Sequence, residues 1–201
     1  MRRLRTAAAS GLVTGAVLAT VLAGCTSEGS DAPAPAPATN DVSAVETALE
    51  PCPQQPDQEP AGAETLPPLS FDCLGGGSLD LARAPGVPTL VNLWGSWCAP
   101  CRKELPLLQE FADAAGDRVR VVGVISKDGV PQADSFADDA GVTFPAAFDG
   151  DGKLMTELGL NALPFTYFLD ADGALVHTEV GDVSSVDELR TLVAQHLGVQ
   201  L

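Results

Sequence analysis

The chain has 201 residues, a length that suits one ordinary domain with short additional segments. Its 27 acidic residues outnumber its 11 basic residues, and the formal net charge is −16. A surface of this charge repels nucleic acids and anionic lipid head groups, so the composition argues against a protein that binds either of them by charge.

The first 24 residues are predicted to form a signal peptide. Three arginines within the first five residues form a basic start, and the apolar stretch from 11 to 23 is too short for a transmembrane helix. The stretch ends in LAGC, which resembles the lipobox of bacterial lipoproteins. We therefore expect a lipid on Cys25 and a position on the extracytoplasmic face of the bacterial cell membrane. The alternative is an ordinary signal peptide with Cys25 incidental.

Residues 25–65 are predicted to form a lipidated, Pro/Ala-rich tether followed by an arm that carries Cys52. The tether lacks apolar periodicity, so it cannot bury a core. Cys52 and Cys73 remain as an even pair in an exported protein, and a structural disulfide between them is the simplest inference. The alternative is a regulatory pair that exchanges disulfides with Cys98.

Residues 66–201 alternate between strand-like and helix-like patterns and are assigned to one domain. We expect hairpins over 69–82 and 163–181, buried strands over 88–95 and 118–126, and an added strand and short helix over 142–159. Helices are expected over 101–115, over 131–141, and from a capping box at Ser185 and Glu188 to about Leu197.

The most informative segment is WCAPC, residues 97–101, which joins a buried strand to an amphipathic helix. Cys98 would lie at the helix N-terminus, where free N–H groups and the helix dipole stabilise a thiolate. Cys98 is therefore the predicted nucleophile, and the more buried Cys101 is the predicted resolving thiol. A structural disulfide and half of a zinc site are the alternatives, although the sequence has neither a second CxxC nor a matching Cys–His spacing.

The segment NLWGSWCAPCRKELPLLQEF, residues 92–111, resembles the active site of thioredoxin-fold proteins. The resemblance is strongest to the TlpA/ResA-like (DsbE-like) branch of exported, membrane-tethered thiol-disulfide oxidoreductases, and it covers about residues 69–197. It implies an α/β thioredoxin-like fold, with a central mixed β-sheet flanked by helices, an N-terminal β-hairpin and the TlpA-type insertion.

The resemblance also implies a substrate-binding edge around Pro164. The family keeps a cis-proline there, facing the CxxC, and the adjoining backbone at Leu163 would hold a substrate peptide. The alternative is a trans-proline that opens a strand. Phe165 departs from the threonine that often follows this proline, which leaves the shape of the groove open. Trp97 is expected to cover one side of the disulfide and to contact substrate.

Glu104 is the third predicted catalytic residue. It lies one helical turn after Cys101, and the resemblance implies that a glutamate at this spacing influences thiol ionisation. If buried, its carboxylate would have a raised pKa and could take the proton of the resolving thiol. The alternative is an ordinary surface glutamate in the first helical turn. Thioredoxins carry an aspartate six positions before the first cysteine, where this chain has Asn92.

No metal and no cofactor are predicted apart from the redox-active Cys98–Cys101 disulfide. Acidic turns over 149–152 and 170–173 do not continue as calcium-binding loops. His177 and His196 are assigned no role.

The predicted function is disulfide exchange with exported client proteins, leaning to a reductase supplied by a membrane electron donor, with apocytochrome c as a candidate client. The preference for a reductase comes from Ala99 and Pro100, the two residues between the cysteines. Without a histidine there, the Cys98 thiolate is only moderately stabilised, and the reduction potential should be nearer the reducing end of the family. An oxidase that introduces disulfides into secreted proteins is the first alternative. A thiol peroxidase and a non-catalytic binding module are further alternatives.

Overall fold

The structure of the protein is a computed structural model that describes residues 41–42 and 45–201. The predicted signal peptide, the lipidation of Cys25 and most of the tether lie outside the described residues. Within the described part of the chain, no helix is both long and apolar enough to cross a bilayer.

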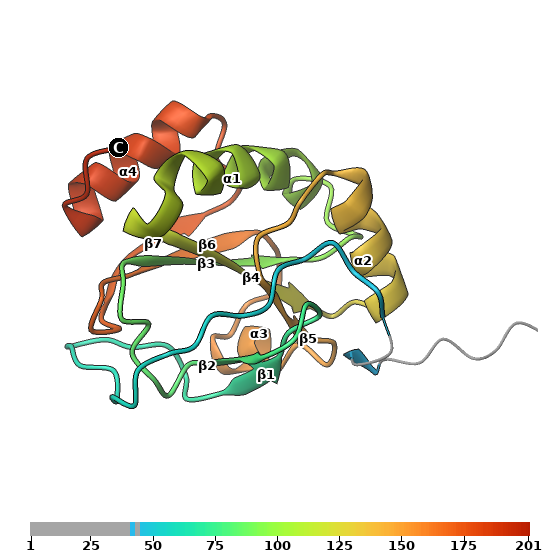
Figure 1. Cartoon of the computed structure of the whole chain (residues 1–201), viewed down its shortest axis with the longest axis horizontal. Coiled ribbons are helices and arrows are strands. Elements are labelled where there is room, and N and C mark those ends of the chain that lie inside the picture. The colour runs from blue at the N-terminus through green and yellow to red at the C-terminus, as the bar shows by residue number, and fades with distance from the viewer. Residues whose placement is uncertain (1–40, 43–44) are drawn as a thin grey trace, which may run out of the picture. The chain divides into compact units, whose positions relative to one another are not determined.

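A five-stranded mixed β-sheet forms the centre of the fold (Figure 1). In spatial order its strands are β5 (Ala146–Asp149), β4 (Arg120–Ser126), β3 (Thr89–Trp94), β6 (Phe165–Leu169) and β7 (Leu175–Val180). The first three run parallel, and β6 and β7 are antiparallel to their neighbours. All six residues of β3 are buried, as expected for a central strand that is covered on both faces.

Helices and a small hairpin cover the two faces of this sheet. Figure 1 shows α1 (Cys101–Ala115), α2 (Val130–Asp139) and α4 (Val186–Leu197) on one face. The other face carries α3 (Lys153–Glu157) and the antiparallel hairpin of β1 (Ser70–Asp72) and β2 (Ser78–Asp80). A short 3₁₀ helix (Gly116–Arg118) follows α1. This arrangement is a thioredoxin-like α/β fold and confirms the predicted fold class.

The segment upstream of the predicted domain boundary packs against the domain. The buried side chain of Leu49 belongs to the hydrophobic core, and the N–H of Glu50 donates to the carbonyl of Thr143 at 2.8 Å. The disulfide Cys52–Cys73 joins this arm to the end of the first hairpin strand. Residues 45–65 thus lie in the same compact unit as residues 66–201, and the packed unit begins before residue 66.

The expected elements occur close to their predicted ranges. The added strand β5 forms one edge of the sheet and is followed by the short helix α3, and α4 starts where Ser185 caps it. The Ser185 hydroxyl accepts the N–H of Glu188 at 3.2 Å. The Glu188 carboxylate accepts from the N–H and hydroxyl of Ser184, both at 2.7 Å, so the return contact of this cap goes mainly to the residue before the N-cap.

Candidate active site

The two cysteines of WCAPC lie where the central strand ends and α1 begins. They form a disulfide, and the helix starts at Cys101 with Pro100 as its N-cap residue. The backbone N–H of Cys101 donates to Cys98 Sγ at 3.2 Å. The first N–H groups of a helix lack partners within the helix, so this contact would favour a thiolate at Cys98. Cys98 is 3% exposed and Cys101 is fully buried, the order expected for a nucleophile and a resolving thiol.

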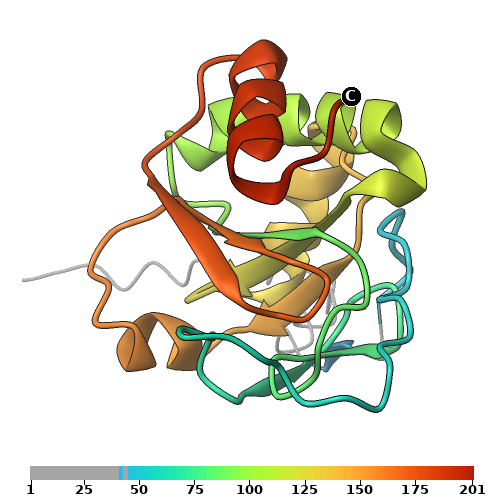
Figure 2. The ribbon, with the colours of Figure 1, turned by 90° about the vertical axis from the view of Figure 1, so that its left-hand side faces the viewer.

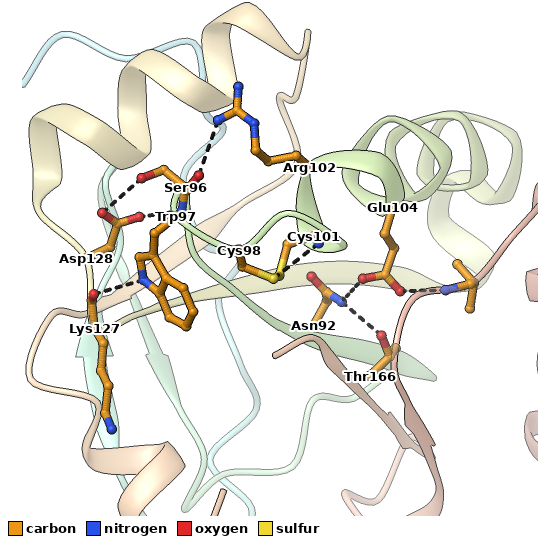
Figure 3. Close-up of a disulfide and its surroundings, with 11 residues drawn as sticks. Asn92, Ser96, Trp97, Cys98, Cys101, Arg102, Glu104, Lys127, Asp128 and Thr166 are labelled. Carbon is orange, nitrogen blue, oxygen red and sulfur yellow. Dashed lines mark hydrogen bonds between the residues drawn. A yellow bond between two sulfur atoms is a disulfide. The ribbon is translucent and has the colours of Figure 1, made fainter. Parts of the chain in front are cut away.

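A loop after β4 fixes the segment that leads into the cysteines. The Asp128 carboxylate accepts from the backbone N–H of Ser96 at 2.5 Å and from its hydroxyl at 3.1 Å (Figure 3). The indole N–H of Trp97 donates to the Lys127 carbonyl at 3.0 Å. Sequence reasoning missed Lys127 and Asp128, because they lie about 30 residues from their partners and belong to no recognisable motif.

Trp97 remains 52% exposed beside the cysteines. Figure 3 shows its ring on the Lys127 side of the loop. Trp94, by contrast, is fully buried and packs edge-on against Phe136 of α2. The tryptophan nearest the disulfide is therefore available at the surface, and the earlier one belongs to the core.

Pro164 lies at the same edge of the sheet as the cysteines. The register pairs Phe165 of β6 with Leu93 of β3, which places Pro164 opposite the end of β3, where the WCAPC loop begins. The Leu163–Pro164 peptide bond is cis, and the Pro164 carbonyl accepts the N–H of Gly181 at 3.1 Å. The alternative of a trans-proline is therefore wrong for this structure.

Glu104 is fully buried beneath the first turn of α1, so the surface-glutamate alternative is wrong. Its carboxylate accepts the backbone N–H of Val183 at 3.2 Å and the side-chain N–H of Asn92 at 3.1 Å. Burial raises its pKa to about 7, and the two hydrogen bonds partly oppose the shift because they favour the ionised form. A carboxyl group with this pKa can accept or release a proton near neutral pH.

Asn92 occupies the position where thioredoxins carry an aspartate, and it connects three segments of the chain. Its Nδ2 donates to Glu104 of α1 and, at 2.9 Å, to Thr166 Oγ1 of β6 (Figure 3). Sequence reasoning noted only that the thioredoxin base is missing here. Thr166 carried no signal, because the bond joins residues 74 positions apart.

The second disulfide lies in a different layer of the molecule. Cys73 directly follows β1 and forms a β-bridge with Ala147 of the edge strand β5. The hairpin of β1 and β2 covers the sheet face opposite α1 (Figure 2). Cys52 and Cys73 are both buried and bonded to each other, as predicted for the pair. The structure therefore does not bring them into the cluster formed around Cys98.

The acidic turns have structural partners. The Asp149 carboxylate accepts the N–H groups of Lys153 and Leu154 at 2.7 and 2.9 Å and so caps α3. The Asp170 carboxylate accepts the N–H groups of Asp172 and Ala174 within its own turn. Among the described residues, no group of three His, Cys, Asp or Glu side chains is arranged to hold a metal ion.

Comparison with known proteins shows that the chain is similar to thiol-disulfide redox proteins. A protein-family model described as Redoxin matches residues 60–193. The chain is 33% identical over 132 residues to the thiol:disulfide interchange protein DsbE of Vibrio cholerae, covering 64% of this chain and 70% of that protein.

Two solved structures extend the comparison. One is a secreted Mycobacterium tuberculosis disulfide oxidoreductase homologous to DsbE of Escherichia coli, with 28% identity and a TM-score of 0.57 over 64% of this chain and 96% of that one. The other is the exposed lipoprotein thioredoxin Etrx1 of Streptococcus pneumoniae, with 27% identity and a TM-score of 0.52 over 62% of this chain and 96% of that one.

Proposed function

The chain belongs to the Redoxin family and is a thioredoxin-fold thiol-disulfide oxidoreductase of the DsbE type, and we propose that it exchanges disulfides with exported client proteins through Cys98 and Cys101. The observation that carries the proposal is the Cys98–Cys101 disulfide at the N-terminus of α1, with the buried Glu104 one turn further along the helix. The redox disulfide is the electron carrier, and the proposal requires no other cofactor.

In the reducing direction, the Cys98 thiolate attacks a client disulfide and one client sulfur leaves as a thiolate. Cys101 then attacks Cys98 Sγ in the mixed disulfide, which releases the second client sulfur and closes the Cys98–Cys101 bond. Two electrons pass from the protein to the client. Glu104 would accept the proton that Cys101 loses, and the two client thiolates take up protons from solvent.

The client would bind along the edge formed by Trp97, Leu163 and Pro164. The exposed indole of Trp97 offers an apolar surface on one side of the cysteines. The register of β3 and β6 supports a place for Pro164 at the same edge. Because this region lies at the end of the sheet, an extended peptide could reach Cys98 from outside.

We place the protein on the outer face of the cell membrane, held by a lipid on Cys25. The LAGC motif and the apolar leader support this location, and the buried Cys52–Cys73 disulfide fits an oxidising compartment. The likeness to a secreted oxidoreductase and to an exposed lipoprotein also supports it. Replacement of Cys25 by serine should release the protein from the membrane fraction, and unchanged membrane attachment would overturn the anchor.

We propose the reducing direction, with a membrane electron donor and apocytochrome c as a candidate client. The absence of a histidine between the cysteines supports it. Glu104 supports it as well, since a carboxylate near the cysteines disfavours a thiolate there. A less stable thiolate makes the reduced pair a stronger reductant. The opposing observation is the N–H of Cys101 on Cys98 Sγ, which stabilises a thiolate and favours the oxidase alternative.

The reduction potential of the Cys98–Cys101 couple distinguishes the two directions. The purified protein is equilibrated in dithiothreitol or glutathione buffers, and the fraction of the Cys98–Cys101 disulfide is measured by thiol labelling and mass spectrometry. A value near that of thioredoxin, about −270 mV, is expected for a reductase. A value near that of DsbA, about −120 mV, would make the protein an oxidase.

A further inference from the structure

The side-chain oxygen of Asn92 is a buried acceptor that the hydrogen bonds of the oxidised site leave unused. Asn92 is fully buried, and among the described residues its Oδ1 has no hydrogen-bond partner. An unpaired buried carbonyl is destabilising, because it has lost its hydrogen bonds to water, so a buried amide at this place calls for a partner in some state of the protein.

The orientation of the amide is determined by its neighbours. Nδ2 faces Glu104, as suits an ionised carboxylate that can only accept, and the second N–H of the same nitrogen donates to Thr166 Oγ1. Oδ1 therefore points away from both of these residues. Figure 3 shows it turned toward the disulfide formed by Cys98 and Cys101.

Strand and helix geometry supports this placement. Side chains alternate along β3, and Asn92 lies on the face that α1 covers, since its side chain bonds to Glu104 of that helix. Cys101 and Glu104 are three residues apart on α1 and occupy the same face of the helix. The amide of Asn92 can thus contact both residues, Glu104 through Nδ2 and Cys101 through Oδ1.

We propose that Asn92 is a positioning residue of the redox site: Oδ1 accepts the S–H of Cys101 when the site is reduced, while Nδ2 holds the Glu104 carboxylate. This inference rests on the proposed function in one respect, namely that the Cys98–Cys101 pair is reduced and reoxidised. It is independent of the client and of the direction of electron flow.

The chemistry explains why the acceptor is unused in the oxidised state. When an incoming thiolate attacks Cys98 Sγ, the Cys98–Cys101 bond breaks and Cys101 leaves as a thiolate, which then takes up a proton. The second thiol of the same donor then attacks the donor sulfur of the mixed disulfide, which forms the donor's disulfide and releases Cys98 as a thiolate, so two electrons have entered the site. Cys101 now carries the hydrogen that Asn92 Oδ1 can accept. Because S–H is a weak donor, the effect on the reduced state should be modest.

The charged groups around this cluster also favour a neutral thiol at Cys101 over a thiolate. Glu104 on α1, Glu179 on β7 and Asp182 in the loop after β7 are all acidic, and the last two raise the pKa of Glu104. Arg102, the next residue after Cys101, turns away, donates to the Ser96 carbonyl and stacks over Phe136. A thiolate at Cys101 would add a negative charge one helical turn from Glu104, so a neutral thiol held by an amide oxygen suits the site.

The S–H stretching band of Cys101 tests the contact directly. In a Cys98→Ala protein, Cys101 is a permanent thiol, and subtracting the infrared spectrum of the Cys98→Ala, Cys101→Ser protein isolates its band. We expect a band shifted to lower frequency by hydrogen bonding. A band at the position of a free thiol would overturn the proposal, and this measurement needs no variant at Asn92.

A double-mutant cycle on the reduction potential separates direct action from action through Glu104. Asn92→Leu should make the reduced state about threefold to tenfold less favourable, which corresponds to about 14 to 30 mV for a two-electron couple. The same shift should appear in a Glu104→Gln background. A shift that disappears in that background would mean that Asn92 acts only through Glu104 and would overturn the proposal.

Thr166→Val is the matched control. This substitution removes the other partner of Asn92 Nδ2 and loosens the same cluster, but it leaves Oδ1 untouched. The reduction potential of the Cys98–Cys101 couple in this variant should therefore stay at the wild-type value. A shift equal to that of Asn92→Leu would indicate general loosening and overturn the proposal. If client reduction failed while the S–H band and the cycle behaved as expected, the proposed function would be wrong and the role of Asn92 would stand.

Discussion

The described chain contains two disulfides whose surroundings differ. Cys98–Cys101 closes the turn that leads into α1, where the N–H of the first helical residue contacts Cys98 Sγ and a buried carboxylate lies one turn away. Cys52–Cys73 joins the N-terminal arm to a hairpin, and the N–H groups of both residues donate to carbonyls of the hairpin turn. The same covalent bond is therefore placed for exchange at one site and for holding two segments together at the other, because thiolate stabilisation depends on the surroundings.

The largest expected effect is the loss of exchange when the first pair is broken. Cys98→Ser should abolish reduction of a protein disulfide, since the attacking thiolate is gone. Cys101→Ser should instead trap a mixed disulfide between Cys98 and the client, visible by mass spectrometry. Residual exchange in Cys98→Ser would show that Cys98 is not the nucleophile and would remove the distinction between the two disulfides.

The second pair should behave in the opposite way. Replacing Cys52 and Cys73 together by serine should lower the free energy of unfolding by about 3 kcal/mol, because the bond closes a loop with a sequence separation of 21. Urea unfolding measures the loss, and the rate of client reduction by the folded variant should remain unchanged. A folded variant that no longer exchanges would support the regulatory alternative.

Glu104 should make the stability of the protein depend on pH. Its pKa is about 7 in the folded protein, above the ordinary value of 4.5. The folded state therefore holds the proton more tightly, and stability is greatest below pH 4.5 and falls as pH rises toward 7. A rise of the pKa from 4.5 to about 7 corresponds to a loss on the order of 3 kcal/mol across this pH range.

Urea unfolding of the oxidised protein at several pH values checks this prediction. In Glu104→Gln the fall assigned to Glu104 should be absent, and the rate of exchange should lose any inflection near pH 7. The same fall in wild type and variant would assign the pH dependence to other groups.

The smallest expected effect concerns the exposed edge beside the cysteines. Trp97→Ala should weaken client binding by about 1 kcal/mol and raise KM about fivefold, with little change in the reduction potential. Trp97→Phe serves as the control, because it keeps an aromatic surface but loses the hydrogen bond to Lys127. An unchanged KM in Trp97→Ala would place the client contact elsewhere on the edge.

Much of the fold and part of the site could be predicted from the sequence. The strands, the helices and the position of Cys98 before α1 depend on local periodicity and on the turn chemistry of neighbouring residues, which a single sequence displays. The pairing of Cys52 with Cys73 followed from counting cysteines in an exported chain. The cis-proline was expected from the resemblance to a family rather than from the residues themselves.

Only the tertiary structure decided what surrounds the cysteines. The spacing of Glu104 after Cys101 suits a surface residue as well as a buried one, and the segment at Val183, distant in sequence, covers it. The same holds for the bond between Asn92 and Thr166 and for the arm around Leu49. The reason is physical: the pKa of a carboxyl group and the partner of an amide depend on which distant segments exclude water, and local sequence patterns do not specify those contacts.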